Sequence, residues 1–549
     1  MGIFQSSMGQ IAVKGRIQDF RVPTTDPAGK KALFTGKDAR SAGNNLFEII
    51  SPHLETFTAG GKPDMIVDSP RSFYDQQRND AYSDAELTVR SADGKFSIQG
   101  RGWQWSSARS ILTISNAVEG VIRRSALNDA ALVGSGKSNQ LVTIRADRLE
   151  YHPEKAIFSG TVRVVDEQGT LEAEILTAVM EPEASGIREL IAEEKVALAQ
   201  GDREARSGRA VYTLSDRVLR LTEKPTWQLG ERFGSCEILI LEQTNNLFRA
   251  EQNVYMRLPV KEVITNSVMR AGEGRGEQFL EVNADRFEFR DLKTRSIAIY
   301  EGNVAARELN RRLECELLTL HFMASNRLSQ IVAEKGVSLW QGEDHAMGER
   351  AVYDFGDGRI ELIGNPKWEM RNVQGRSETL VMWSKEERIE AGGKVEMILQ
   401  GRNSLPFDLL PNGNTNRTRT TTDSPIHVRS ARFVQSGKLF EFFENVRVND
   451  ARGQIDCASL SVQTGASNQV ERVVAEGDVI VTQENSQVIG QRAVYSAGEG
   501  EVVITGSPKI MTPDREVIAP RFVLNRTSGR FRFDAPYRIT MRRASSRKE

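Results

Sequence analysis

Short runs in which apolar and polar residues alternate cover most of this sequence. Typical runs are GNVAAR from Gly302, AVYDF from Ala351 and VEMIL from Val395, each bounded by Gly, Asn, Asp or Pro. Runs of this length, rich in Val, Ile and aromatic residues, are typical of β-strands. Residues 184–196 could form a helix, but their counterpart at Asn468 contains Val-Val and a Gly-Asp break, which favours a strand. The pattern therefore predicts an all-β fold.

The same short words recur in the same order three times. The first copy begins at Ala146, the second at Ala284 and the third at Ser430. Equivalent residues lie 141 or 142 positions apart, as in Val162, Val304 and Val446; Tyr212, Tyr353 and Tyr495; and Pro225, Pro366 and Pro508. A fixed period of this kind indicates a repeat architecture. We therefore predict one module of about 142 residues that occurs three times.

The N-terminal region is predicted to hold a further fragment of the module. A gapless shift of 75 residues places Leu87 on Val162, Gly94 on Gly169, Phe96 on Leu171, Ala117 on Ala192 and Val121 on Val196. Residues from about 68 to 123 thus correspond to the opening half of a module. Residues 1–67 have no obvious counterpart in the repeats.

The repeats predict four domains, at residues 1–125, 140–259, 280–400 and 426–543. The first is a partial module and the other three are complete. Residues 260–279 and 401–425 are rich in Gly, Asn, Thr and Pro, which is typical of loops. We therefore interpret these two segments as linkers.

A phase slip recurs inside each copy. In the first copy apolar residues alternate through Leu171 and Ala173, skip one position, and alternate again from Leu176. An extra residue keeps one set of side chains on the inside while a strand bends, as a β-bulge or corner does. The slip therefore predicts a folded sheet with one apolar face. The equivalent residues of the other copies are Leu313, Cys315 and Leu318, then Ile455, Cys457 and Leu460.

The opposite face of this sheet is predicted to be charged. The residues between the apolar positions should face water; they are Glu172, Glu174, Glu314, Glu316 and Asp456. In the recurring word RAVY, Ala and Tyr share the inner face and Arg lies on the outer one, as Arg209, Arg350 and Arg492. The dipeptides before the shared prolines have the composition of turns and are predicted to close hairpins: Glu223-Lys224, Gly364-Asn365 and Gly506-Ser507.

The charge balance argues against one class of partner. The 549 residues include 73 Lys and Arg against 74 Asp and Glu, a net charge of −1, with both signs mixed along the chain. Nucleic-acid binding needs a basic surface, so none is predicted. No window approaches about 18 uninterrupted apolar residues, so no transmembrane helix is expected. The N-terminus lacks the charged start and apolar core of a secretory signal, so any signal or membrane anchor is expected to lie outside this sequence.

Cysteines and histidines are scattered. Cys236, Cys315 and Cys457 lie 79 and 142 residues apart, which fits no zinc motif, and we interpret them as small buried residues. The five histidines form no HExxH motif, and the sequence contains no P-loop or GxSxG motif. We therefore predict no metal site, no cofactor and no catalytic residue.

The recurring words resemble the OstA/LptA family of lipopolysaccharide transport proteins. The ordered words are AD…Y, GNV, L-x-A/C, I-x-A-x-G-x-V, RAVY and L-x-G-x-P, in three copies. Residues 68–115 resemble the related LptC family through a Tyr-Asp pair, an Asp-Gly pair and a Trp-rich strand. The third copy departs from the pattern, with Glu444 in place of Gly160 and Gly302, and Ile510 in place of Trp227 and Trp368.

This resemblance implies tandem V-shaped antiparallel β-jelly rolls, solenoid-like modules stacked edge to edge into one elongated periplasmic array. It implies that the lipid A acyl chains of lipopolysaccharide bind in an apolar groove and pass from the inner to the outer membrane. The implied partners are the inner-membrane lipopolysaccharide ABC exporter at the N-terminal edge, residues 10–60, and the outer-membrane lipopolysaccharide assembly protein at the C-terminal edge, residues 521–542. The expected groove lining consists of Phe96, Ile98, Val162, Val164, Leu171, Ala173, Leu176, Ala210, Tyr212, Val304, Leu313, Cys315, Leu318, Ala351, Tyr353, Val446, Ile455, Cys457, Leu460, Ala493 and Tyr495.

Two other functions stay open. β-Solenoid enzymes degrade polysaccharides with clustered carboxylates, and Glu193, Glu334 and Glu476 recur once per module, although the pattern places them on the outer face. The chain could also be a structural or adhesive β-array whose lining is filled by its own side chains. Because Ala, Cys and Val are frequent at the lining positions, the sequence favours an open groove.

Overall fold

The chain folds into β-strands joined by short connections. The computed structural model describes residues 16–124, 141–259, 279–399 and 425–541, apart from gaps at 26–28, 30, 44, 59, 168, 182–185, 246, 293–294, 309–310, 324–327, 371–372, 384–385, 387, 451–452, 466–468, 526–527 and 529. These described residues form 41 strands and no α-helix, so the predicted all-β class is confirmed. Most of both predicted linkers lies outside them, and the four domain boundaries stay predictions.

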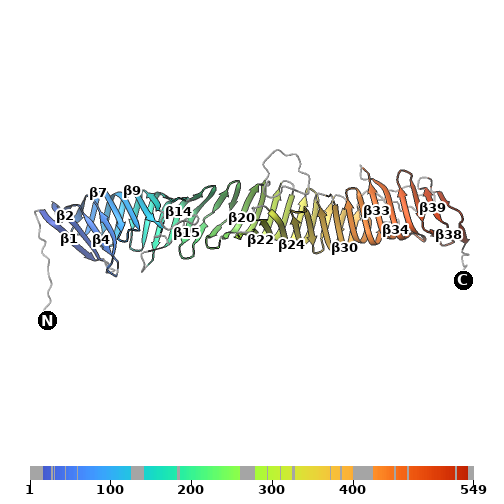
Figure 1. Cartoon of the computed structure of the whole chain (residues 1–549), viewed down its shortest axis with the longest axis horizontal. Coiled ribbons are helices and arrows are strands. Elements are labelled where there is room, and N and C mark those ends of the chain that lie inside the picture. The colour runs from blue at the N-terminus through green and yellow to red at the C-terminus, as the bar shows by residue number, and fades with distance from the viewer. Residues whose placement is uncertain are drawn as a thin grey trace, which may run out of the picture. The chain divides into compact units, whose positions relative to one another are not determined.

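The chain divides into two units, one at 1–257 with 286–291 and one at 258–285 with 292–549. In each, successive strands lie side by side (Figure 1). The first unit contains β1 (Arg16–Thr25), β2 (Lys31–Gly43), β3 (Leu46–Ile50), β4 (His53–Phe57), β5 (Pro63–Asp68), β6 (Arg71–Asp75), β7 (Asp80–Ser91), β8 (Phe96–Ser106), β9 (Ile111–Arg123), β10 (Leu141–Ala146), β11 (Arg148–Tyr151), β12 (Lys155–Val165), β13 (Thr170–Met180), β14 (Ile187–Gln200), β15 (Arg203–Thr213), β16 (Val218–Thr222), β17 (Thr226–Leu229), β18 (Arg232–Ser235), β19 (Ile238–Glu242) and most of β20 (Leu247–Pro259).

Strand β21 (Phe279–Leu292) contains residues of both units. The second unit continues with β22 (Arg295–Glu308), β23 (Arg311–Met323), β24 (Leu328–Gln341), β25 (Asp344–Asp354), β26 (Arg359–Ile363), β27 (Lys367–Met370), β28 (Val373–Arg376), β29 (Thr379–Trp383), β30 (Arg388–Leu399), β31 (Ile426–Ser436), β32 (Leu439–Asn449), β33 (Gln454–Thr464), β34 (Val470–Gln483), β35 (Ser486–Ser496), β36 (Glu501–Thr505), β37 (Lys509–Met511), β38 (Arg515–Ile518), β39 (Arg521–Asn525), β40 (Arg530–Phe533) and β41 (Arg538–Met541).

Each module has two walls because two short strands share one long neighbour. β15 pairs with both β16 and β17, so that Arg209 lies opposite Thr222 and Arg206 opposite Thr226. β16 then pairs with β19 and β17 with β18, and both of those strands pair with β20. Strands β25 to β30 repeat this antiparallel pattern in the second unit. A long strand therefore has to bend from one wall into the other, as in a β-jelly roll.

The bend lies at a fixed place in each long strand. The register of β13 against β14 shifts between Glu172 and Ile175, so the predicted phase slip is confirmed. Left-handed backbone accompanies the bend, with φ of 47° at Thr161 in β12 and 54° at Lys195 in β14. The extra residue turns the strand without moving its apolar side chains to the other face. The equivalent shifts lie between Glu314 and Leu317 and between Asp456 and Ser459.

The dipeptides before the shared prolines do not close hairpins, and that prediction was wrong. Glu223 and Lys224 both have left-handed backbone, with φ of 64° and 59°, but the strands on either side of them pair with β15 and not with each other. The dipeptide is therefore the corner itself, where one edge folds from wall to wall. The Pro225 carbonyl accepts the Cys236 N–H at 3.1 Å across this corner. The residue types typical of turns indicate left-handed backbone, but they do not indicate which strands pair.

The N-terminal region contains the closing half of a module, so residues before 68 do have a counterpart. β2 pairs with β3 and β4, β3 with β6, β4 with β5, and β5 and β6 with β7, which is the pattern of β15 to β20. Pro52 occupies the place of Pro225, because its carbonyl accepts the Ser69 N–H at 3.2 Å as that of Pro225 accepts Cys236. In the N-terminal region the closing half of a module comes first in the sequence and an opening half follows it. A complete module has the opposite order.

The gapless shift of 75 residues fails in β9. Val121 is 38% exposed and Ala117 is also exposed, whereas Ala192 and Val196 are buried. The bend of β9 lies at Ala117, where φ is 52°, and Val118 takes the buried position after the bend that Val196 takes in β14. A shorter connection before β9 moves the bend along the sequence, and an ungapped alignment cannot follow it.

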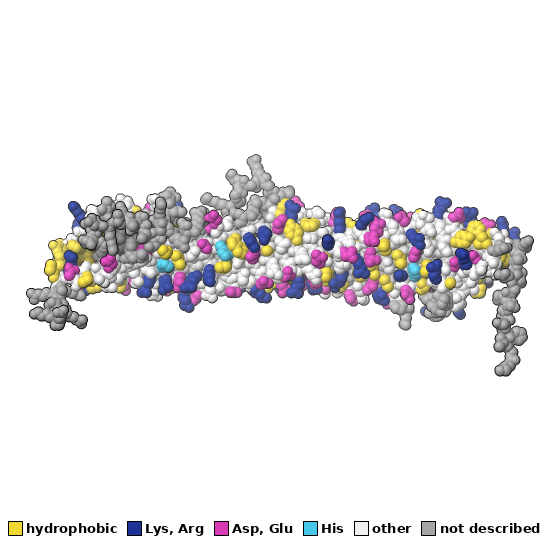
Figure 2. All heavy atoms as spheres, turned by 180° about the vertical axis from the view of Figure 1, so that it is seen from behind, with side chains coloured by type: hydrophobic (Ala, Val, Ile, Leu, Met, Phe, Trp, Pro, Cys, Tyr) yellow, Lys and Arg dark blue, Asp and Glu magenta, His cyan; other side chains and the backbone are white. Residues whose placement is uncertain are grey.

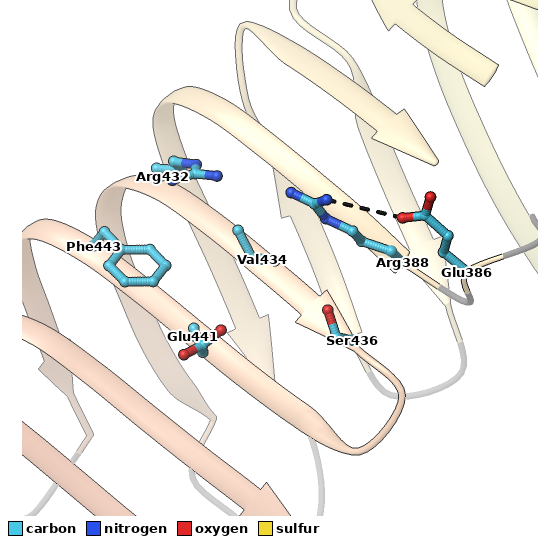
Figure 3. Close-up of a pocket in the computed structure, with 7 residues that line it drawn as sticks. All are labelled: Glu386, Arg388, Arg432, Val434, Ser436, Glu441 and Phe443. Atoms are coloured by element: carbon cyan, nitrogen blue, oxygen red, sulfur yellow. Dashed lines mark ion pairs between the residues drawn. The ribbon is translucent and has the colours of Figure 1, made fainter. Parts of the chain in front are cut away.

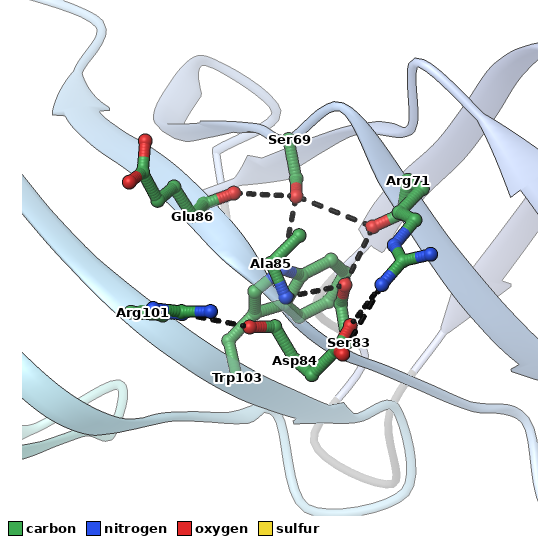
Figure 4. A network of polar contacts seen from close by, with 8 residues as sticks. All are labelled: Ser69, Arg71, Ser83, Asp84, Ala85, Glu86, Arg101 and Trp103. Carbon is green, nitrogen blue, oxygen red and sulfur yellow. Dashed lines mark hydrogen bonds and ion pairs between the residues drawn. The ribbon is translucent and has the colours of Figure 1, made fainter.

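Side chains complete the corner of this N-terminal half module (Figure 4). The Ser69 hydroxyl donates to the Glu86 carbonyl at 2.7 Å and accepts the Trp103 indole N–H at 3.2 Å. The Ser83 hydroxyl donates to the Arg71 carbonyl at 2.7 Å. A bend takes backbone groups out of the strand ladder, and buried backbone groups need partners. These hydroxyls supply them, which holds the two walls at the corner.

Candidate functional site

The predicted lining residues lie in the interior between the two walls of each module. Sixteen of the 21 are buried, among them Leu171, Leu176 and Leu318, which are 3 to 4% exposed. The other five are half-buried: Phe96, Leu313, Tyr353, Ala493 and Tyr495. Burial places these side chains inside but does not decide whether the interior admits a ligand, so their role in a groove stays a prediction.

An apolar cavity of about 270 Å³ opens between the walls in the second unit. Four predicted residues line it, namely Leu313, Leu318, Ala351 and Tyr353. Other lining residues were not among the 21 predicted, for example Leu320, Ala333 and Met382. Leu320 continues the alternation from Leu318, and Ala333 is the equivalent of Ala192, so period and repeat could have found both. The cavity brings together side chains from β20 to β27 and β29, which become neighbours only when the sheet folds.

One lip of this cavity is polar. Glu308, Arg311, Gln341 and Asp344 end or begin four neighbouring strands and lie opposite one another in the register. Arg311 Nη1 lies 3.6 Å from Glu308 Oε2, and Glu308 is only 8% exposed. A buried carboxylate needs such a partner. We call these four residues the polar lip.

The opposite lip is mostly apolar. Tyr353 on β25 pairs in register with Ile360 on β26, which pairs with Met382 on β29. Burial raises the pKa of the Tyr353 hydroxyl, whereas the guanidinium of Arg311 lowers it. Tyr353 is therefore neutral at physiological pH, and Arg311 is near enough to act on it. The two lips of the cavity therefore differ in polarity.

The equivalent place in the first unit is occupied by a buried ion pair. Arg124 is fully buried, and its Nη2 lies 3.1 Å from Oδ2 of Asp166, which occupies the position of Glu308. Tyr212, the equivalent of Tyr353, is 1% exposed and donates to Gln243 Oε1 at 3.5 Å. Burial is the main cause of the raised pKa of Tyr212, and Arg124 acts in the opposite direction. In both places an arginine is paired with an acid and is near enough to a tyrosine to lower its pKa.

The three cysteines are free and buried, as predicted. Burial raises the thiol pKa to about 12 for Cys236 and Cys457 and to about 11 for Cys315. Because a nucleophilic or metal-binding cysteine requires a thiolate, these thiols are unreactive at neutral pH. Among the described residues, no three His, Cys, Asp or Glu side chains are placed to hold a metal ion.

The outer face carries paired charges. Figure 2 shows basic and acidic side chains intermixed over the face that it draws. The recurring carboxylates each meet an arginine of the RAVY word across β14–β15 and its equivalents. The pairs are Glu193–Arg209 at 3.2 Å, Glu334–Arg350 at 3.2 Å and Glu476–Arg492 at 2.8 Å. These carboxylates are ion-pair partners on a solvated face, where such pairs add little stability.

A hollow of about 410 Å³ on the outer face of β30 to β32 contrasts with the apolar cavity. Figure 3 shows Arg388, Arg432, Glu386 and Glu441 around it. Both arginines bind Glu390, with Arg388 Nη2 at 2.9 Å and Arg432 Nε at 2.7 Å. The two arginines that line this hollow are therefore engaged in surface ion pairs.

In the described part of the chain, no helix is long and apolar enough to cross a membrane.

Two comparisons with known proteins gave matches. Residues 143–246 and 281–389 match the family model LptA/(LptD N-terminal domain) LPS transport protein. The third copy and the LptC-like region lie outside these matches. A crystal structure of LptH, the LptA homologous periplasmic component of the conserved lipopolysaccharide transport device from Pseudomonas aeruginosa, is 13% identical. It matches over 22% of this chain and 94% of its own, with a TM-score of 0.19.

No curated protein matches the chain. The first family match contains Asp166 and Tyr212 but not Arg124, and the second contains Glu308, Arg311 and Tyr353. The family is a transport family, periplasmic or associated with the outer membrane, and its members are not enzymes. Residues 143–246 and 281–389 therefore belong to the LptA/LptD N-terminal family of lipopolysaccharide transport proteins.

Proposed function

We propose that the apolar interior of the modules is a groove that binds the acyl chains of lipid A and conducts lipopolysaccharide through the periplasm from the inner to the outer membrane. The observation that carries this proposal is the apolar cavity of the second unit, which four predicted lining residues reach. The 21 proposed lining residues offer mainly apolar contact. The 21 lining residues, and the absence of an enzymatic reaction, are part of the proposal.

Hydrophobic burial supplies the affinity. A buried methylene contributes about 0.8 kcal/mol, so ten methylenes of one acyl chain contribute about 8 kcal/mol before the costs of binding. The groove therefore needs no strong polar contact to hold lipid. Directional movement then requires an energy source in a partner, which fits the proposed ABC exporter.

The terminal strands are the proposed contacts with partners. Among the described residues, β1 pairs with β2 on one side and no strand pairs with its other side. All four residues of β41 are exposed, with Met541 84% exposed and Ile539 49% exposed. An open strand edge can accept a strand from another chain. We assign the N-terminal edge to the inner-membrane exporter and the C-terminal edge to the outer-membrane assembly protein; residues 10–15 lie outside the described part.

The rival function is a structural or adhesive array with a self-filled interior. The buried Arg124–Asp166 pair and Tyr212 are the residues that favour filling, in the first unit. The cavity beside Leu318 and Ala351 favours a ligand, in the second. The two functions therefore predict different effects on lipid binding when the cavity in the second unit is blocked.

Two neighbouring alanines allow a matched test. Ala306 lines the cavity, while Ala305 points to the opposite face of β22. Ala306→Phe should lower the affinity for lipopolysaccharide at least roughly tenfold by filling the cavity, whereas Ala305→Phe should leave it unchanged. Thermal unfolding of both variants checks that they fold. Unchanged binding by a folded Ala306→Phe variant would exclude this cavity as the lipid site.

A further inference from the structure

A glutamine stands at the same place in each of the three complete modules, and in the second module it belongs to the polar lip. Gln341 is the last residue of β24, between Arg311 and Asp344 in the register. Gln200 and Gln483 are the last residues of the equivalent strands, β14 and β34. They lie 141 and 142 residues from Gln341, which is the module period. The side chain faces the same way as Leu339, two residues earlier, which also lines the cavity.

Two of these glutamines have no partner for their side-chain oxygen. Oε1 of Gln341 and Oε1 of Gln483 are both buried and accept no hydrogen bond from the described residues. Gln483 as a whole is 6% exposed. Gln200 differs, because it makes an interaction within the protein. Leaving a buried amide oxygen unpaired costs stability, and such groups in native proteins are rare. The same unpaired atom at equivalent places in two modules therefore points to a role outside the protein's own packing.

The surroundings of Gln341 define the group that would pair with it. Apolar side chains line the cavity on one side of the glutamine, and Glu308, Arg311 and Asp344 share its lip. The lip carries two acids and one base, so it does not select for a single charge. An uncharged donor placed where apolar chains meet a polar head would satisfy the oxygen. Amide N–H groups and hydroxyl groups are donors of this kind.

We propose that Gln341 and Gln483 accept hydrogen bonds from hydroxyl or amide N–H groups at the junction between the acyl chains and the head of the lipid. This inference rests on the proposed function and deepens it. The acyl chains supply affinity without direction, since hydrophobic contact is non-directional. The two lip glutamines fix how deep the chains enter and which way the head faces. They are binding residues for the head–chain junction, one in each of two successive modules.

The test compares two probes with the full-length chain. Lipid A carries donors at its head–chain junction, whereas a fatty acid methyl ester of matched chain length carries acceptors alone. Gln341→Leu and Gln483→Leu should each weaken lipid A binding roughly 3- to 10-fold, the value of one hydrogen bond, and leave methyl ester binding unchanged. Gln374→Leu is the matched control, because Gln374 lies on β28 and donates to Glu369 Oε1 at 3.2 Å on an exposed surface.

A stability measurement separates binding from structure. Leucine replaces an unpaired buried amide by an apolar group of similar size, so the ligand-free variants should unfold at the same temperature as the wild type or at a higher one. Normal lipid A binding by both variants would overturn this inference and leave the proposed groove intact. Equal loss of both probes together with a lower unfolding temperature would also overturn it, because the glutamines would then be structural. Failure of the wild type to bind lipid A would remove the proposed function as well.

Discussion

The Cβ carbon that Gly160 lacks would lie 2.5 Å from Oδ2 of Asp147. Gly160 has φ of +76°, at the bend of β12, and its carbonyl accepts the Asp147 N–H at 3.0 Å. Gly302 stands in the same relation to Asp285, with 2.4 Å between the missing Cβ and Oδ2. The bend of a module therefore requires glycine for two reasons, its left-handed backbone and the neighbouring carboxylate.

The third module changes both residues of this pair. Glu444 replaces the glycine and keeps left-handed backbone with φ of 61°, and Ala431 replaces the aspartate. Alanine removes the carboxylate that would collide with a side chain at the bend. The departure of the third copy from the repeat is therefore a compensated exchange, and the pair can be tested by exchanging it elsewhere.

We predict that Gly160→Glu destabilises the bend of β12 by about 2 to 3 kcal/mol, because it adds backbone strain and a steric clash. Adding Asp147→Ala should recover about 1 kcal/mol or more, a coupling typical of residues in contact. Hydrogen–deuterium exchange of β11 and β12 measures the local opening free energy in the full chain. Additive effects of the two substitutions would contradict the clash.

The reverse exchange in the third module should have the opposite sign. Glu444→Gly is expected to stabilise β32 by about 1 kcal/mol, because glycine adopts the left-handed backbone without strain. Gly302→Glu in the second module provides the contrast, since Asp285 is still present there. Slower exchange at β32 in Glu444→Gly is the expected result, and faster exchange would show that the glutamate has a favourable contact that outweighs its strain.

The buried thiols predict how stability depends on pH. Folding raises the pKa of Cys457 to about 12 and of Cys315 to about 11, whereas an unfolded thiol has a pKa near 8.5. The folded state keeps its proton, so this stability is fully present below about pH 8.5 and is lost as the pH rises toward 11 or 12. Each thiol should lower the free energy of unfolding by about 1.4 kcal/mol per pH unit within that window.

Urea unfolding between pH 8 and pH 9 tests this slope, because unfolded tyrosines, with a pKa near 10, are still mostly neutral there. Cys315→Ala and Cys457→Ala should each make the slope shallower, and the double variant should be the least sensitive. Identical slopes in the wild type and the double variant would mean that other groups control alkaline unfolding.

The C-terminal edge can be removed with little damage to the interior. Phe522 and Leu524 of β39 are buried, whereas every residue of β41 is exposed. Deleting residues from 530 onward should therefore leave the chain folded and abolish binding to the outer-membrane assembly protein. Deleting β1 is the matched control, which should affect the inner-membrane exporter instead. A pull-down with each partner measures both, and retained outer-membrane binding would contradict the assigned edge.

Sequence periodicity was enough to predict the bend and the inner face. The skipped position between Ala173 and Leu176 becomes a register shift, because an alternating strand shows an extra residue directly in its pattern. The closing half module around Pro52 was missed, because it precedes the opening half and so reverses the order of the words. Val121 was misplaced for a related reason, since the connection before β9 is shorter than its counterpart in the repeat.

The polar lip could not be predicted from the sequence. Glu308, Arg311, Gln341 and Asp344 lie at the ends of four strands and resemble ordinary turn residues when they are read along the chain. They become one edge only when β22 to β25 lie side by side. The unpaired oxygen of Gln341 is likewise a property of its surroundings, which no single-residue pattern records.

The central claim is that lipid enters the interior between the walls. Photo-crosslinking of lipopolysaccharide with probes at Leu176, Leu318 and Leu460 tests it most directly, against probes at Glu174 and Glu316 on the opposite face. Crosslinks should form at the leucine positions, Leu318 above all because it lines the cavity, and not at the glutamates. Equal labelling of both sets would contradict the groove, and labelling of neither would favour a self-filled array.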